Sequence, residues 1–170
     1  IYHGSSSGLS TTAATQLESN QASAQFGRSV ASAGDVNGDG YSDVIVGAYN
    51  FDDGQTNEGA AFIYHGSSSG LSTTAATQLE ENQASAYFGY SVASAGDVNG
   101  DGYSDVIVGA YNFDNGQTNE GAAFIYHGSS SGLSTTAATQ LESNQASAQF
   151  GSSVASAGDV NGDGYSDVIV

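Results

Sequence analysis

One nine-residue segment rich in oxygen-bearing side chains occurs three times in this chain. The sequence Asp-Val-Asn-Gly-Asp-Gly-Tyr-Ser-Asp stands at residues 35–43, 97–105 and 159–167. Side-chain ligand oxygens lie at positions 1, 3, 5 and 9, and position 6 is glycine. The hard cation Ca²⁺ takes roughly six to eight oxygen ligands, and only a sharply curled backbone turns alternate side chains toward one ion. Glycine permits that curl because positive φ angles are open to it.

We therefore predict one Ca²⁺ in each loop, held by four side chains and by the backbone carbonyl of the tyrosine at position 7. The predicted ligands are Asp35, Asn37, Asp39, Tyr41 and Asp43; Asp97, Asn99, Asp101, Tyr103 and Asp105; and Asp159, Asn161, Asp163, Tyr165 and Asp167. Position 12 is valine, where an EF-hand loop has a bidentate glutamate. The alternative is an ion-free turn, but three carboxylates in nine residues would then repel one another.

The loops recur because the whole chain is repeated. The same segment begins at Ile1, Ile63 and Ile125, so the period is 62 residues and residues 125–170 form a truncated third unit. The first two units differ at Ser19/Glu81, Gln25/Tyr87, Arg28/Tyr90 and Asp53/Asn115, and the third differs from the second at Glu81/Ser143, Tyr87/Gln149 and Tyr90/Ser152. A fixed period of this size is typical of solenoids, propellers and arrays.

Each unit contains the apolar patterns of four short strands and no helical period. In the first unit and the start of the second, we expect strands at about 29–33, 43–48, 59–65 and 75–80. Four antiparallel strands repeated radially predict an all-β fold of β-propeller blades, part of a larger propeller or array. We take residues 1–170 as one repeat region, with complete blades at about 28–83 and 90–145 and a half-blade at each end. Neighbouring repeats, or copies of the chain, are expected to complete the half-blades.

Composition excludes several classes of function. The formal net charge is -17 with a single basic residue among Lys and Arg, so neither nucleic-acid phosphates nor an anionic membrane surface is an expected partner. No apolar run is long enough to insert into a membrane. There is no cysteine, no Gly-x-Ser-x-Gly elbow, and each histidine ends a predicted strand, so we expect no enzyme. Because the sequence begins with Ile1 and has no methionine, we expect a processed chain or a segment of a longer one.

The motif of each unit resembles a known family. Phe26-Gly27, the 35–43 loop and Gly47-Ala48 together resemble the FG-GAP repeat of integrin α-subunit propellers, and the match recurs from Phe88 and Phe150. Tyr49 and Tyr111 stand where that family usually has proline. The resemblance implies a seven-bladed propeller, Ca²⁺ in the hairpin between strands 1 and 2, and an extracellular or cell-surface location with a role in cell adhesion.

We expect a calcium-stabilised structural or adhesive protein, acting alone or as a polymer. The alternatives are a propeller that binds a carbohydrate or protein ligand, and an accessory propeller of a larger secreted enzyme. The resemblance implies a ligand face opposite the calcium loops, built from segments at about 20–28 and 49–59 and their repeats. Most differences between units fall there, so Tyr87 and Tyr90 are candidates for contact with a protein or glycan. Neutral variation on exposed loops is the other interpretation.

Overall fold

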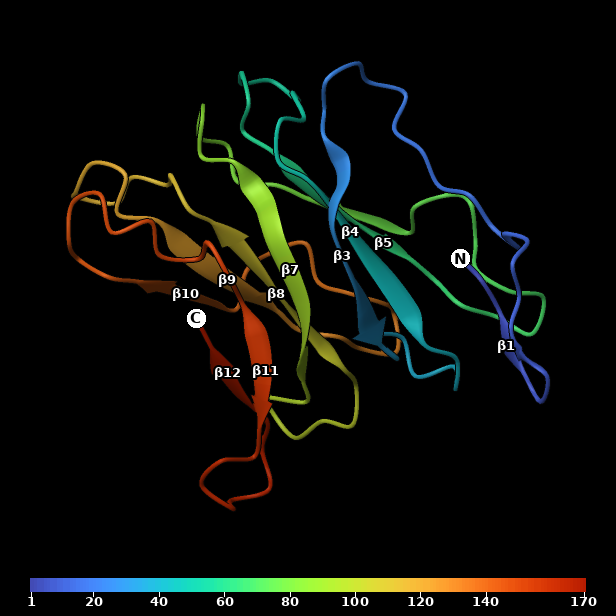
Figure 1. The fold of residues 1–170 in the computed structure, drawn as a ribbon. Coiled ribbons are helices and arrows are strands. Elements are labelled where there is room, and N and C mark those ends of the chain that lie inside the picture. Colours follow the sequence, from blue (N-terminus) through green and yellow to red (C-terminus); the bar gives the residue numbers. More distant parts are fainter.

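The computed structural model describes all 170 residues and consists of strands joined by turns and loops (Figure 1). Two sheets are complete, with four antiparallel strands each in chain order. The first contains β3 (Phe26–Gly34), β4 (Asp43–Ala48), β5 (Ala60–Tyr64) and β6 (Thr77–Leu79); the second contains β7 (Phe88–Gly96), β8 (Asp105–Ala110), β9 (Ala122–Tyr126) and β10 (Thr139–Glu142). The prediction of an all-β fold made of four-stranded propeller blades is confirmed. No helix of a length and apolarity suited to crossing a bilayer is present.

The chain ends form smaller pieces of the same pattern. At the N-terminus, β1 (Gly4–Ser5) and β2 (Gly8–Leu9) make a short hairpin, and hydrogen bonds from Ser10 N to His3 O at 2.8 Å and from Ala14 N to Ile1 O at 2.9 Å continue the pairing. At the C-terminus, β11 (Ala155–Gly158) pairs with β12 (Asp167–Ile169). Each end therefore has a two-stranded piece where the interior has four strands.

The first strand of each complete sheet begins three residues earlier than the sequence predicts. β3 starts at Phe26 rather than at Ser29, and its register against β4 shifts between these two residues. The shift is a β-bulge in which two extra residues of β3, Gly27 and Arg28, interrupt the pairing with β4. Gly27 adopts φ 81° within it, and Gln25 just before it has φ 57°. The regular alternation of side chains in β3 therefore begins only at Ser29, after the bulge.

The main core lies between the two complete sheets. Ile45 and Ile63 of the first sheet share one buried cluster with Phe88, Val106 and Phe124 of the second. Both faces of β4 and β8 are largely buried, which explains their nearly continuous apolar sequence. A sheet of this kind is stable only when both of its faces are covered, so each blade depends on its neighbours.

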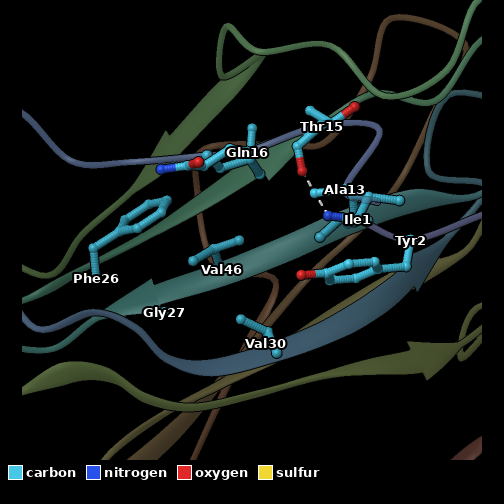
Figure 2. A pocket seen from close by; sticks show the side chains of 11 residues that line it. Ile1, Tyr2, Ala13, Thr15, Gln16, Phe26, Gly27, Val30 and Val46 are labelled. Atoms are coloured by element: carbon cyan, nitrogen blue, oxygen red, sulfur yellow. Dashed lines mark hydrogen bonds between the residues drawn. The ribbon is translucent and has the colours of Figure 1, made fainter. Parts of the chain in front are cut away.

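The first sheet has an incompletely covered face. Val30 of β3 is 64% exposed, whereas Val92, its equivalent in β7, is 8% exposed because the first sheet covers it. Beside Val30 lies a groove of about 450 Å³, into which Phe26 and Val46 also project and which Ile1 and Tyr2 border from the N-terminal segment (Figure 2). The groove therefore leaves part of the apolar face of the first sheet open to solvent.

Candidate metal centre

The three acidic loops lie at one end of the sheets. They join β3 to β4, β7 to β8 and β11 to β12, and Figure 1 shows all three hairpins along the same edge of the molecule. In the first loop, Gly38 and Gly40 adopt φ 73° and 87°, which curl the backbone as the spacing predicts. The loops in the second and third units repeat these angles within a few degrees.

The aspartate at position 1 organises the curl. Asp35 Oδ1 accepts hydrogen bonds from the backbone N–H of Gly38 at 2.7 Å and of Asp39 at 3.1 Å, and Oδ2 accepts from Gly40 at 2.8 Å. The same bonds recur in the other two loops. In the exposed third loop, the N–H of Gly164 and its neighbours hold the pKa of Asp159 below its ordinary value. The side chain at position 1 therefore faces the interior of the loop in all three units.

Positions 3 and 5 are hydrogen-bonded to each other and to the loop backbone. Asn37 Oδ1 accepts from Asp39 N at 3.0 Å, Asn37 Nδ2 donates to Asp39 Oδ2 at 3.0 Å, and Asp39 Oδ1 accepts from Tyr41 N at 2.9 Å. Asn37 is half-buried and Asp39 is exposed to solvent. Each of these oxygens accepts one hydrogen bond and keeps a lone pair that can bind a cation.

Position 9 lies deeper than the rest of the loop. Asp43 is fully buried, and its two carboxylate oxygens accept hydrogen bonds from Val36 N and Gly66 N, each at 2.9 Å. Burial raises the pKa of Asp43, and the two N–H donors and His65 oppose that rise. Asp105 has the equivalent environment in the second unit. This residue ties the loop to the turn after β5, a structural role that the spacing alone did not reveal.

The oxygen donors of each loop are of the kind that Ca²⁺ prefers. Their carboxylates, however, do not converge on one point in the structure. Each loop supplies three aspartates, an asparagine and backbone carbonyls, and the chain has one basic residue among Lys and Arg against 18 acids. Nowhere in the chain do three or more acidic or histidine side chains converge as a ready metal site. The ligand assignment therefore stays a prediction for all three loops.

Neighbouring loops are linked by Ser104, which the sequence analysis did not single out, and by the ring of Tyr103, of which only the backbone carbonyl was given a role there. The backbone N–H of Ser104 donates to Asp35 O at 2.9 Å, and the Ser104 hydroxyl accepts from Asp35 N at 3.2 Å. The ring of Tyr103 covers Gly38 so closely that a Cβ there would lie 2.5 Å from Tyr103 Cε1. Position 8 and the ring at position 7 thus connect each loop to position 1 and position 4 of the preceding one.

The opposite end of the sheets carries a tyrosine cluster, defined here as Tyr49, Tyr87, Tyr90 and Tyr111. Tyr87 stacks on Tyr111 with ring centroids 5.3 Å apart, and Tyr90 lies 4.5 Å from Tyr111. Tyr49 touches both Tyr87 and Tyr90, and the Arg28 guanidinium lies 5.5 Å from the centre of the Tyr90 ring. The variable tyrosines are half-buried against one another, so part of their role is to join two units.

Comparison with known proteins identifies the family. The FG-GAP repeat model matches residues 26–64, 88–126 and 150–170. The chain belongs to the FG-GAP repeat family. Each match to an FG-GAP repeat begins at the Phe-Gly pair and contains one acidic loop.

Relatives of this FG-GAP chain include integrin α subunits. It is 38% identical over 147 residues to integrin alpha-7 of Rattus norvegicus, covering 85% of the chain and 12% of that protein. It is 34% identical over 149 residues to integrin alpha-4 of Xenopus laevis, with 85% and 14% covered. It is also 42% identical over 91 residues to integrin alpha pat-2 of Caenorhabditis briggsae, with 51% and 7% covered. The chain thus spans a small part of each relative.

Proposed function

We propose that this chain is part of an extracellular, non-enzymatic β-propeller that Ca²⁺ stabilises and that has a structural or adhesive role. The observation that supports this proposal most strongly is the presence of three identical acidic loops at one end of adjoining sheets. The similarity to integrin α subunits agrees with an adhesive role and with a location outside the cell, where calcium is abundant.

Calcium would act here as a structural ion. When bound, it neutralises carboxylates that have no basic partner in the loop. The backbone N–H groups hold the aspartate at position 1, and the serine and tyrosine contacts connect one loop to the next. An ion in one loop would therefore stiffen its neighbour as well.

The open face of the first sheet supports a second part of the proposal. We infer that a neighbouring repeat, or another copy of the chain, covers Phe26, Val30 and the adjoining groove. The contact between β3 and β7 inside the chain is the template for that interface, since the same residue types meet there. An interface of this type joins unlike surfaces and can continue into an array.

Isothermal titration with calcium chloride tests the proposed function. The wild-type chain is expected to bind three ions in its acidic loops, and Asp39→Asn is expected to remove one of them. Asn keeps the size of the side chain and its bond to Tyr41 N, so the variant should fold. No heat of binding attributable to the loops, in a protein that is folded by circular dichroism, would contradict the proposal.

A further inference from the structure

The dipeptide Asn-Gly occurs four times in the chain, at residues 37–38, 99–100, 115–116 and 161–162. Asparagine is among the thermally labile residues. The backbone nitrogen that follows it can attack the side-chain amide carbon and close a five-membered succinimide ring. Glycine favours this attack because it has no Cβ to hinder the close approach of its backbone. Whether each pair reacts therefore depends on how the fold holds the amide and the N–H that follows it.

The three Asn-Gly pairs in the acidic loops are held at every group that would react. In the first loop, the Gly38 N–H donates to Asp35 Oδ1 at 2.7 Å, so the attacking nitrogen is already engaged. Asn37 Oδ1 accepts from Asp39 N at 3.0 Å, and Asn37 Nδ2 donates to Asp39 Oδ2 at 3.0 Å. The other two loops repeat all three bonds. Rotating the amide onto the glycine nitrogen would therefore break hydrogen bonds at both ends of the amide.

The fourth pair, in the loop between β8 and β9, lacks most of these restraints. Asn115 and Gly116 are both exposed, and the Gly116 N–H donates no hydrogen bond. Asn115 Nδ2 has one partner, Glu142 Oε2 at 2.6 Å, and Asn115 Oδ1 has none. Apart from its chain neighbours, no atom lies within 4 Å of the place where a Cβ of Gly116 would stand. The Asn115 amide can therefore turn toward the Gly116 nitrogen by breaking one hydrogen bond.

We propose that Asn115 is a site of spontaneous deamidation, whereas the fold protects the asparagines of the acidic loops. Base from the solvent removes the proton of Gly116 N, and this nitrogen then bonds to Asn115 Cγ. The Cγ–Nδ2 bond breaks, and Nδ2 takes up a proton and leaves as ammonia. Water then opens the ring: addition to Cγ gives aspartate, and addition to the backbone carbonyl carbon gives isoaspartate. One water is consumed, one ammonia is released, and the chain gains one negative charge.

The first unit shows how the fold accommodates the aspartate product. Asp53 occupies the equivalent position there, and Gln78 Nε2 of β6 donates to Asp53 Oδ2 at 2.8 Å. Gln140, the equivalent of Gln78, donates to Glu142 Oε2 at 3.3 Å and can bond to an aspartate at position 115 in the same way. Deamidation to aspartate therefore gives the second unit the arrangement of the first. Isoaspartate instead adds a methylene to the loop backbone and has no counterpart in the first unit.

Mass spectrometry of chymotryptic peptides, after the folded chain has been kept in chelator at mildly alkaline pH, tests the proposal. We expect the peptide with Asn115 to gain the mass difference between an amide and a carboxyl group. The three loop peptides should gain it about tenfold more slowly or less, because poorly oriented reacting groups lose at least that much in rate. In concentrated urea, which removes the restraints, all four pairs should react at similar rates. Asn115→Gln, whose longer side chain closes a ring less readily, should abolish the fast mass gain.

Two results would overturn the proposal. Rates in the folded chain that are equal at Asn115 and in the loops, or higher in the loops, would show that the hydrogen bonds of the loops give no protection. A mass gain at Asn115 in urea but not in the folded chain would show that the single bond to Glu142 is sufficient restraint. Because the incubation is done in chelator, neither result depends on calcium binding, which titration of the loops measures separately.

Discussion

The hydroxyl of Tyr126, fully buried in β9, donates a hydrogen bond to Glu81 Oε1 at 2.9 Å, across the boundary between two units. Glu81 is present only in the second unit, since Ser19 and Ser143 occupy the equivalent positions. Burial raises the pKa of Tyr126, and the neighbouring carboxylate raises it further. One of the few differences between nearly identical repeats thus creates a polar contact between adjacent blades.

The Glu81 carboxyl should make stability depend on pH. Burial raises its pKa, and the Tyr126 hydroxyl only partly opposes that rise. A carboxyl with a raised folded-state pKa contributes stability that is fully present below its unfolded pKa and lost as the pH rises through the folded pKa. Glu81→Gln keeps an acceptor for Tyr126 without the charge, so we expect it to unfold at higher urea than wild type at pH 7 and at about the same urea near pH 3.5. Glu18→Gln, at an exposed glutamate, is the control. An equal gain at both pH values would contradict the assignment.

The coverage of each sheet should determine the cost of truncating its valines. Val92→Ala removes buried methyl groups between the two complete sheets and should lower the free energy of unfolding by about 1–2 kcal/mol. Val30→Ala changes the same repeat position on the uncovered face and should cost much less in dilute protein. When a neighbouring repeat or copy covers that face, the two costs should become similar. Equal costs in the dilute monomer, by urea denaturation, would contradict the inferred open face.

The packing of one acidic loop on the next should affect how much an alanine at loop position 4 lowers the melting temperature. Gly38 and Gly162 occupy the same loop position with φ 73° and 76°, but only Gly38 is covered by a tyrosine ring, that of Tyr103. Alanine is strained at either position by about 1–2 kcal/mol. Gly38→Ala should lower the melting temperature by more than Gly162→Ala, because it also displaces the ring. Equal losses would show that the ring contact contributes nothing to stability.

The tyrosine cluster should contribute to both packing and binding. Tyr87→Ser together with Tyr90→Ser removes two rings that pack on Tyr49 and Tyr111, so the melting temperature should fall. We expect weaker self-association, or weaker attachment to cells or immobilised glycans, because tyrosine is enriched at binding hot spots. The matched control is Tyr41→Ser, which removes an exposed ring at the other end of the sheets. Unchanged binding would restrict the cluster to joining two units.

The fold was largely predictable because the same apolar strand patterns recur in each 62-residue unit. The run Val44-Ile45-Val46 indicated a strand buried on both faces, and β4 is one. The start of β3 was not predictable to the residue, because the bulge at Gly27 hides the alternation. The Tyr126–Glu81 bond joins residues 45 positions apart in adjacent sheets, and no local pattern encodes such a contact.

The candidate site was predictable in its donors but not in their placement. The spacing identifies the oxygen-bearing residues of each loop, and the glycine positions predict the curl that the structure has. Asp43 was read as the last ligand, yet its two backbone hydrogen bonds to Val36 and Gly66 depend on the turn after β5. The role of Ser104 likewise depends on how two units stack, which the sequence of one loop does not contain.

The central claim is that Ca²⁺ bound in the acidic loops stabilises the sheets, and the melting temperature as a function of calcium concentration tests it most directly. At ten times the dissociation constant each ion contributes about 1.4 kcal/mol, so three loops together should raise the melting temperature by roughly 10 °C over a sample in chelator. A variant with Asp39→Asn, Asp101→Asn and Asp163→Asn should lose most of that rise while staying folded. An equal rise in wild type and in the triple variant, or no rise in wild type, would contradict the account.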